Sequence, residues 1–412
     1  MTRSDFLVLG AGMAGACAAL ELQLRGHQVT LVDRRPPGRE TSYGNAGIIQ
    51  REAVEPYAFP RAWGAIMSAA LRRGLDIHYH PGAVAASLPR LGRYWRASAP
   101  ASHRRITRDY ARLIEHTTSE HQRYISAAGA DDLVRRDGFR CFYRTPAAFD
   151  RALQRAETLR RDFGLACSAL DADALARAEP GLRQRQVGAL HWQQPWTVQD
   201  PGALVERYAA LFQQRGGRLL IGDAGTLRQH GSSWQVQTGE GVVQATQAVI
   251  ALGPWSGTAT AALGYRFPMI FKRGYHRHYA GGARVDLPLL DAERGYVLAP
   301  MRAGLRLTTG AEIARIDAAP TPRQLQGCEA VARELLDLGQ PVEQTPWIGA
   351  RPCMADMLPV IGAAPRHPGL WFDFGHGHQG FTLGPASARL LADQIEGATP
   401  FVDPRPFLPT RF

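Results

Sequence analysis

The residues near the start of the chain that are suited to chemistry are the glycines of Gly10-Ala11-Gly12-Met13-Ala14-Gly15 and the acid Asp33, 18 residues after the last glycine. An apolar run at 5–9 precedes the glycines, and a run of helix-forming composition at 16–24 follows them. In a strand–turn–helix–strand unit, such glycines allow a tight turn and a close approach of the backbone to a pyrophosphate, while the acid accepts hydrogen bonds from ribose hydroxyls. The N–H groups at the start of the helix would face the phosphates. The pattern therefore predicts a dinucleotide site.

The stretch 34–49 after Asp33 combines small and hydroxyl-bearing residues and is placed to wrap around a cofactor. Arg34 and Arg35 would suit the 2′-phosphate of NADP, but the adjacent charge of Asp33 would repel that phosphate. We therefore do not expect NADP.

A second concentration of unusual residues lies near the C-terminus. Arg351-Pro352 leads through Asp356 to Gly362, and an apolar strand at 370–374 enters the glycine-rich run 375–384. We expect a helix from Pro385 to Glu396 directly after this run. Such a junction between strand and helix offers backbone N–H donors and a positive helix end to an anion or to a developing negative charge.

The segments between these two regions predict the rest of the fold. Helices are expected at 147–163, 171–178 and 201–214, and strands at 139–143, 188–192, 218–221, 234–237, 241–243 and 248–252. Asp200 is expected to cap the helix at 201–214. After residue 266 the pattern changes to strands separated by turns, at 269–271, 275–279, 295–299 and 305–309, followed by a helix at 321–337. This change predicts an α/β domain together with a second, α+β domain built on a mixed or antiparallel sheet.

Composition excludes several classes of protein. At 412 residues the chain is long enough for two domains with a large core. The net charge is +11, but the basic residues, all arginines except Lys272, are scattered singly or in pairs, so we expect no nucleic-acid partner. Five cysteines form no C-x-x-C pair, which is typical of a reducing compartment. Residues 6–24 imitate a secretory or membrane segment, but Glu21 lies inside the run and the dinucleotide fold explains it better.

Taken in order, these motifs resemble the flavin-dependent D-amino-acid oxidase and dehydrogenase superfamily, most closely its bacterial D-amino-acid dehydrogenase branch. The resemblance covers nearly the whole chain and rests on the Gly10–Gly15 turn with Asp33, the loop 41–48, the turn 251–256 and the region from Arg351 to Gly384. It implies noncovalent FAD in a discontinuous Rossmann-like domain made of residues 1–60, 198–265 and 349–412. A substrate domain would then occupy residues 61–197 and 266–348.

The resemblance also assigns residues to the cofactor. Those expected to contact FAD are Gly10, Gly12, Met13, Ala14, Gly15, Asp33, Arg34, Thr41, Ser42, Gly44, Asn45, Ala46, Gly47, Ile48, Gly253, Trp255, Gly377, Gly380, Phe381 and Thr382. The segment 377–382 would bring a helix N-terminus to the flavin N1–C2=O edge, where it would stabilise the anionic reduced flavin.

The candidate catalytic residues follow from the resemblance as well. Arg351 occupies the position that clamps the substrate carboxylate in similar enzymes, because a guanidinium binds a carboxylate through two parallel hydrogen bonds. A structural salt bridge is the alternative role for Arg351. Tyr275, His278 and Tyr296 lie on strands that face the substrate in this family, although each would suit ordinary packing equally well. His376 lies inside the second glycine-rich motif.

Two departures from related enzymes bear on the reaction. The sarcosine-oxidase branch attaches its flavin to a cysteine well upstream of the Asp356 position; Cys353 lies too close to that position, so covalent flavin is not expected. That branch also uses a lysine near the flavin for its reaction with oxygen, whereas Lys272 lies in a different motif. We therefore expect a dehydrogenase whose electrons pass to an acceptor other than oxygen, such as a quinone or an electron-transfer chain.

The resemblance thus implies oxidative deamination of an amino acid, of D configuration, to the 2-oxo acid by hydride transfer to flavin N5. The rival enzyme is a secondary-amine or cyclic imino-acid dehydrogenase or oxidase, acting on a proline-, hydroxyproline- or sarcosine-like substrate. A flavoprotein subunit without amino-acid turnover and an NAD-dependent dehydrogenase are the remaining alternatives.

Two further patterns concern metals and membranes. The H-x-H pairs His78/His80, His276/His278 and His376/His378 each place two imidazoles on one side of a strand, but no cysteine or carboxylate pattern accompanies them and no metal is expected. The helical stretch 61–130 carries tryptophans among arginines, which leaves a peripheral contact with a membrane surface open. We expect a cytoplasmic protein, either free or associated with the inner face of the cytoplasmic membrane.

Overall fold

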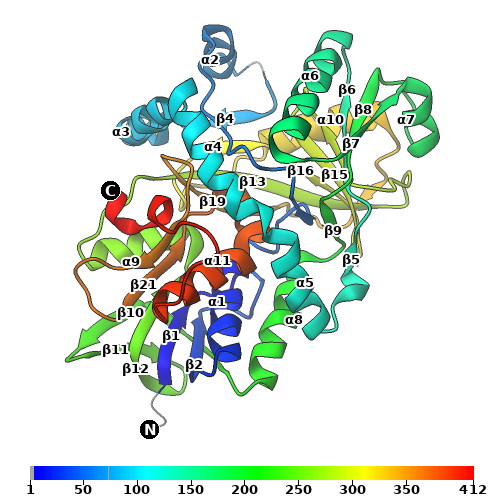
Figure 1. Ribbon diagram of the computed structural model, residues 1–412. Coiled ribbons are helices and arrows are strands. Elements are labelled where there is room, and N and C mark those ends of the chain that lie inside the picture. The colour runs from blue at the N-terminus through cyan, green and yellow to red at the C-terminus, as the bar shows by residue number, and fades with distance from the viewer. Residues whose placement is uncertain (1–3, 73) are drawn as a thin grey trace.

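The glycine turn near the N-terminus belongs to the first of two large sheets in the computed structural model, which describes residues 4–72 and 74–412 (Figure 1). The unit consists of β1 (Ser4–Leu9), α1 (Met13–Leu24) and β2 (Val29–Asp33). The turn requires glycine at two positions. Gly10 has a φ of +106°, and a Cβ at Gly15 would lie 1.7 Å from the Gly10 carbonyl oxygen.

The first sheet is a seven-stranded mixed sheet whose parallel strands end at one edge. Besides β1 and β2 it contains β10 (Arg218–His230), β11 (Ser233–Thr238), β12 (Gly241–Ile250), β20 (Val360–Ala363) and β21 (Leu370–Phe374). Strands β10, β2, β1, β12 and β21 pair in parallel in that order, while β11 and β20 pair antiparallel with their neighbours. Because the carboxyl ends of parallel strands meet at one edge, the turns after β1, β2, β12 and β21 are brought together.

The second sheet has eleven strands and is largely antiparallel. Its strands are β4 (Ile77–Tyr79), β6 (Phe139–Tyr143), β7 (Cys167–Asp171), β8 (Gly188–Trp192), β13 (Met269–Ala280), β14 (Leu289–Asp291), β15 (Tyr296–Met301), β16 (Gly304–Thr308), β17 (Ala311–Ile313), β18 (Gln340–Pro341) and β19 (Trp347–Met354). Strand β13 lies at its centre and pairs with β16, β17, β18 and β19. A small third sheet joins β3 (Ile48–Ile49), β9 (Trp196–Val198) and β5 (Val134–Arg135).

Helices cover both sheets (Figure 1). They are α2 (Trp63–Ala70), α3 (Pro81–Ala97), α4 (Pro100–Glu115), α5 (Thr117–Ala127), α6 (Pro146–Phe163), α7 (Ala172–Ala178), α8 (Pro201–Gln214), α9 (Ser256–Ala262), α10 (Arg323–Leu335) and α11 (Gly380–Ile395). The apolar helix α11 packs against α1 and also contacts α4 and α5, so the largest hydrophobic core spans both parts of the molecule. None of the helices among the described residues has the length and apolar character that crossing a bilayer requires.

The mixed α/β fold predicted from the sequence is confirmed. The strands at 139–143, 188–192 and 370–374 and the helix at 201–214 have the predicted bounds, and the Asp200 side chain accepts a hydrogen bond from the Ala203 N–H as the predicted cap.

Three local predictions need correction. The strands expected at 269–271 and 275–279 are one continuous strand, β13, which runs through Gly274. The helical stretch at 61–130 is interrupted by β4, which pairs with β17. Helix α11 begins at Gly380 rather than Pro385, so the proline lies inside it.

The division into two domains at the predicted boundaries stays a prediction. Strand β19, which carries Arg351, pairs with β13 in the second sheet although its residues after 348 fall in the predicted cofactor domain. The chain therefore passes from the second sheet to the first between β19 and β20.

Candidate active site

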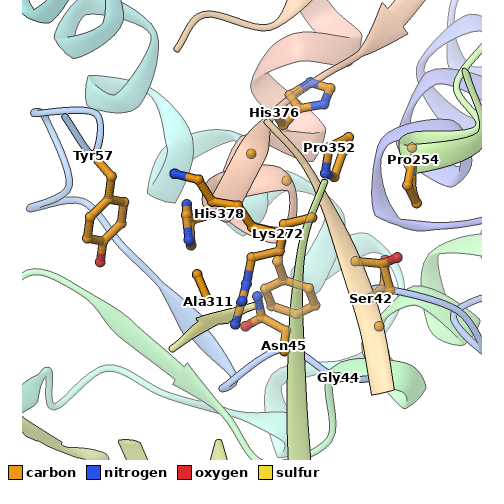
Figure 2. A pocket seen from close by; sticks show the side chains of 18 of the residues that line it. Ser42, Gly44, Asn45, Tyr57, Pro254, Lys272, Ala311, Pro352, His376 and His378 are labelled. Carbon is orange, nitrogen blue, oxygen red and sulfur yellow. The ribbon is translucent and has the colours of Figure 1, made fainter. Parts of the chain in front are cut away.

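A cavity of about 1140 Å³ opens between the carboxyl edge of the first sheet and the second sheet. It is lined by the glycine turn after β1, the loop before β3, the turn after β12, the start of α11 and the facing strands β13 and β19. Figure 2 shows Ser42 and Pro254 on one side of this cavity and Tyr57, His378 and Lys272 toward the other. Volume and shape suit a large, elongated ligand.

The end of the cavity next to β1 is built from backbone. Gly12, Met13 and Ala14 line it at the start of α1, where the first N–H groups of a helix have no partners within the helix. Asp33 closes this end: one carboxylate oxygen accepts a hydrogen bond from the Ala11 N–H at 2.5 Å, and the other accepts one from the Arg35 N–H at 3.2 Å. Burial raises the pKa of the Asp33 carboxyl.

The turn after β12 completes this end. Gly253 and Trp255 line the cavity, and the Arg34 guanidinium lies 4.1 Å from the centroid of the Trp255 ring. Gly10 packs so closely on this turn that a Cβ would lie 2.5 Å from the Ala251 carbonyl oxygen. The glycine is therefore needed for the close approach of the two turns.

The loop at 41–48 forms one wall and is held at several points. The Ser42 hydroxyl accepts a hydrogen bond from the Met13 N–H at 2.9 Å, and the Asn45 side-chain oxygen accepts one from the Gly47 N–H at 2.8 Å. Gly44 lies against Trp347, whose ring occupies the place of a side chain, since a Cβ at Gly44 would lie 1.9 Å from it.

A buried arginine supports the same loop from beneath. The Arg306 guanidinium donates to the carbonyl oxygens of Tyr43 and Asn45 at 2.9 and 2.6 Å and to the His278 Nε2 at 2.9 Å. His278 contacts Glu343 through its other nitrogen. Burial lowers the pKa of Arg306 to about 10. His278 thus acts on the loop through Arg306 and does not line the cavity.

The start of α11 forms the opposite wall, where Gly377, Gly380 and Phe381 line the cavity. Pro385 has no N–H to give to the carbonyl of Phe381, four residues earlier. That carbonyl oxygen instead accepts a hydrogen bond from the buried His121 Nε2 at 3.0 Å, and the Thr382 carbonyl lies 3.2 Å from the same atom. His121 therefore lets the helix start five residues before its proline, with its N-terminus at the cavity.

Arg351 lies in the cavity without a carboxylate partner among the described residues. Its guanidinium donates to the carbonyl oxygens of Gly310 at 2.9 Å and Thr309 at 3.4 Å. It lies directly over Gly274 of β13, where a Cβ would come within 2.7 Å of the Arg351 Nη1. Burial lowers the pKa of Arg351 from its ordinary value. The salt-bridge alternative for Arg351 has no support in this arrangement.

Lys272 also lies in the cavity, which corrects an argument made from the sequence. Lys272 stands opposite Arg351 in the β13–β19 register, and its ammonium donates to the Tyr94 hydroxyl at 3.0 Å. Lys272 lies at the site although it belongs to a different motif. The position of this lysine in the sequence therefore no longer favours a dehydrogenase over an oxidase. The sequence does not reveal this proximity, because it arises from the pairing of β13 with β19, two strands that lie far apart along the chain.

Three aromatic lining residues were missed because they come from segments without a motif, and His378 was missed although it lies inside the second glycine-rich motif. Tyr57 and Phe59, from the segment between β3 and α2, form an aromatic wall with Tyr94 of α3. His378 lies beside Lys272. Burial, together with the charges of Arg351 and Lys272, holds the pKa of His378 well below its usual range, so this imidazole is neutral.

Most of the predicted residues line the cavity. These are Gly10, Gly12, Met13, Ala14, Asp33, Arg34, Thr41, Ser42, Gly44, Asn45, Ala46, Ile48, Gly253, Trp255, Tyr275, Arg351, His376, Gly377, Gly380 and Phe381. The predicted residues outside the lining are Gly15, Gly47, His278, Tyr296 and Thr382. Their contact with a ligand stays a prediction, as do the roles of those that line it.

Two of the catalytic candidates are engaged elsewhere. The Tyr275 hydroxyl donates to Glu312 at 2.9 Å and accepts from the Thr321 N–H at 2.7 Å, so its polar end is directed away from Arg351. Tyr296 is buried in the hydrophobic cluster of the second sheet. Neither hydroxyl has a geometry that we can assign to a reaction.

Three residues of types that bind metals lie close together at β4 and β17. Atoms of His78, His80 and Glu312 lie within 4.8 Å of one another. Glu312, however, is paired with the buried Arg273 at 2.6 Å, which already supplies its counter-charge. We propose no metal there.

The donors around the cavity fit FAD. A glycine turn at the start of a helix suits a diphosphate, an acid after the second strand suits a ribose, and a second helix N-terminus suits the electron-rich edge of a flavin. Gly10 and Gly12 line the cavity without side chains, so the backbone of this turn is open to close approach by a cofactor.

Comparisons with known proteins agree with this fit. The family model described as "FAD dependent oxidoreductase", abbreviated DAO, matches residues 5–394. The chain is 32% identical to a D-amino acid dehydrogenase of Cereibacter sphaeroides, over 96% of this chain and 93% of that protein. It is 30% identical to a D-amino-acid oxidase of Bradyrhizobium diazoefficiens, over 98% of each. Its fold is similar to that of glycine oxidase from Geobacillus kaustophilus, with a TM-score of 0.73, 22% identity and full coverage of both chains.

Proposed function

The chain belongs to the DAO family of FAD-dependent oxidoreductases, and from this we propose that it oxidises D-amino acids to 2-oxo acids and passes the electrons to an acceptor other than oxygen. The observation that carries the proposal is Arg351, a half-buried guanidinium that faces the cavity and is bonded only to carbonyl oxygens among the described residues. A cation that is partly removed from water and has no counter-ion is costly, and an anionic substrate group reduces that cost.

Arg351 would bind the α-carboxylate of the substrate. Its planar fork fixes the carboxylate in one orientation and so fixes the direction of the α-carbon hydrogen. The guanidinium is itself held by two backbone carbonyls, so the side chain loses little further conformational entropy when the substrate binds.

The cofactor, when bound, accepts a hydride from the α-carbon. The residues of the chain prepare that step. The N-terminus of α11 offers N–H groups where negative charge develops, and His121 keeps this turn of the helix in place. Phe59 and the buried Tyr94 limit water around the substrate.

A side-chain base is not required if the substrate amine arrives neutral. The two neighbouring cations, Arg351 and Lys272, favour this neutral form, because a positive potential lowers the pKa of an ammonium group. His378, itself neutral, is placed beside them and is able to accept a hydrogen bond from the amine.

The preference for an acceptor other than oxygen rests on relatives, such as the dehydrogenase at 32% identity, and on the surface above the cavity. Helix α2 lines the cavity with Ile66 and Ala69, while Trp63 and Met67 on the same helix are exposed. We propose that this apolar helix faces a membrane surface and that a lipid-soluble acceptor such as a quinone approaches the site there.

The test is anaerobic. The purified yellow protein is mixed with D-amino acids, L-amino acids and N-alkyl or cyclic imino acids, and the loss of the flavin band near its visible maximum is followed in time. We expect bleaching with D-amino acids and much slower bleaching with their L enantiomers. Reoxidation is then timed with oxygen and with a soluble quinone, and the quinone should be faster.

Each other outcome has a definite meaning. Bleaching only with N-alkyl or cyclic imino acids would assign the protein to the rival enzyme class. A yellow protein that no amine reduces would contradict the proposed activity. Fast reoxidation by oxygen would make the enzyme an oxidase.

A further inference from the structure

The cavity contains a second half-buried cation whose role the binding of a single carboxylate does not explain. Lys272 and Arg351 stand directly opposite each other in the antiparallel β13–β19 ladder, and both line the cavity. The two residues are neighbours on adjacent strands, so two positive charges enter the same cavity, and their mutual repulsion favours an anionic ligand.

The described residues provide no counter-ion for this pair. The Lys272 ammonium donates to the neutral Tyr94 hydroxyl and lies 4.5 Å from the centroid of that ring, while Arg351 donates to backbone carbonyls. Burial raises the pKa of Tyr94, so its hydroxyl stays neutral. Burial disfavours the charged form of Lys272, but its contacts with Cys353 and Tyr94 more than offset this effect and raise its pKa.

The carboxylates that lie near the cavity are held elsewhere. Asp33 is bonded to the glycine turn, Asp291 to Arg144, and Glu312 to Arg273. Glu40 pairs with Arg34, and Asp223 accepts from the Gly225 N–H. Among the described residues, no ion pair joins Asp76 to either cation. The excess positive charge is therefore left for the ligand.

The two cationic groups diverge. The Arg351 guanidinium lies over Gly274, two residues along β13 from Lys272. The Lys272 ammonium extends the other way, toward Tyr94 and His378, where it also lines a small adjoining pocket with Cys353. Cys353 pairs with Ile270, two residues before Lys272. Two residues of a strand span about 7 Å. This is more than the distance between the two oxygens of one carboxylate, so a single carboxylate does not reach both cations.

We propose that the cavity selects amino acids with a second acidic group on the side chain, with Arg351 binding the α-carboxylate and Lys272 binding the side-chain carboxylate. This inference rests on the proposed function and names its substrate class. The aromatic wall packs the short methylene stem between the two carboxylates, and the neutral His378 offers a further hydrogen bond to the distal one.

The first test compares matched substrates. The holoenzyme is reduced anaerobically with D-aspartate and D-glutamate and with D-asparagine and D-glutamine, which have the same shape without the charge. We expect kcat/KM for flavin reduction to be at least about tenfold higher for the acids, since a hydrogen bond between charged groups is stronger than one between neutral groups. The Lys272→Met variant should lose most of this ratio, and Lys272→Arg, which keeps the charge, should retain it.

A binding test does not depend on turnover. Succinate and glutarate, and as matched controls butyrate and valerate, are titrated into the oxidised holoenzyme, and the shift of the flavin absorption band gives each Kd. The dicarboxylates should bind at least tenfold more tightly in the wild type, and Lys272→Met should remove the difference.

The outcomes separate this inference from the proposed function. Reduction by D-alanine, D-asparagine and D-glutamine with no preference for the acids would overturn the inference and leave the function standing. Tight, Lys272-dependent binding of dicarboxylates to a flavin that no D-amino acid reduces would support the two-anion site and refute the function. An equal loss for all substrates in Lys272→Met, or an effect on reoxidation by oxygen alone, would overturn the inference. Should that variant fail to bind FAD, the wild-type ratios decide.

Discussion

A glycine and an arginine on neighbouring strands form one functional unit at the scale of single residues. The Arg351 guanidinium occupies the space that a side chain at residue 274 would fill, with Nη1 2.7 Å and Nη2 2.8 Å from an ideal Cβ. The clashing atoms are the far end of a flexible side chain, so the arginine is able to move aside. Gly274 therefore determines where Arg351 lies rather than whether the protein folds.

We predict that Gly274→Ala lowers kcat/KM for the best D-amino acid by about tenfold to hundredfold, the range expected for a displaced binding group. Most of the change should appear in KM, because the guanidinium is displaced and not removed. The measurement is flavin reduction under anaerobic conditions, together with the Tm of the holoenzyme.

Gly92→Ala is the matched control, since Gly92 lies in α3 and a Cβ there meets no atom within 4 Å. This variant should keep wild-type kinetics. Wild-type kinetics in Gly274→Ala as well would contradict the placement of Arg351 as the carboxylate-binding group.

The same pair of residues explains what the sequence could and could not predict. Arg351 was found because it stands in a recognisable motif. Gly274 was interpreted as a turn between two strands, although it lies inside β13 and leaves room for the arginine. Lys272 was missed because only the register of β13 against β19, a long-range pairing, brings it opposite Arg351.

Helix α11 shows at the scale of elements how a remote side chain decides where a helix begins. The sequence predicts that this helix begins at Pro385, directly after the glycine-rich run. The helix begins at Gly380 because His121, from α5, donates to the Phe381 carbonyl that the proline leaves without a partner. Local patterns predicted most strands and helices, but this boundary depends on a residue far away in the sequence.

His121 also couples the stability of this element to pH. Burial lowers its pKa to about 4, from an ordinary value of 6.5, and its Nδ1 contacts the Tyr208 hydroxyl at 3.0 Å. The folded protein therefore holds a neutral imidazole, whereas the unfolded chain binds a proton once the pH falls below about 6.5. The stabilisation is complete above pH 6.5 and is lost as the pH falls toward 4, by up to about 3 kcal/mol.

We predict that His121→Gln, which keeps an N–H donor but does not titrate, loses less stability than the wild type between pH 7.5 and pH 4.5. The difference should appear as a few degrees in the change of Tm of the holoenzyme. His230→Gln is the control, since His230 is exposed at the end of β10. If His121→Gln and the wild type lose the same number of degrees, His121 carries no such proton linkage.

The two ends of the molecule differ in the character of their surfaces at the largest scale. Helix α2 and the start of α3 lie at the end farthest from the first sheet (Figure 1). This end exposes Trp63, Met67, Leu71 and Leu88, and the Arg61 guanidinium stacks on Trp95 at 3.8 Å from the ring centroid. Apolar side chains among arginines, on a protein of net charge +11, suit an anionic lipid surface. Composition indicated such a contact, but only the fold puts it over the cavity.

We predict that the holoenzyme sediments with vesicles that contain anionic lipid and binds neutral vesicles more weakly. Replacing both Trp63, which is 80% exposed, and Met67, which is 52% exposed, by serine should weaken binding by roughly tenfold or more, because their apolar area no longer enters the interface. Added salt should weaken the attraction of the arginines for lipid but spare the apolar part. Val242→Ser is the matched control, since Val242 is 44% exposed on the β11–β12 hairpin at the other end of the molecule. If the double variant and the wild type sediment equally, charge alone accounts for the contact. If the double variant reduces a membrane-bound quinone as fast as the wild type does, electron transfer does not depend on this surface.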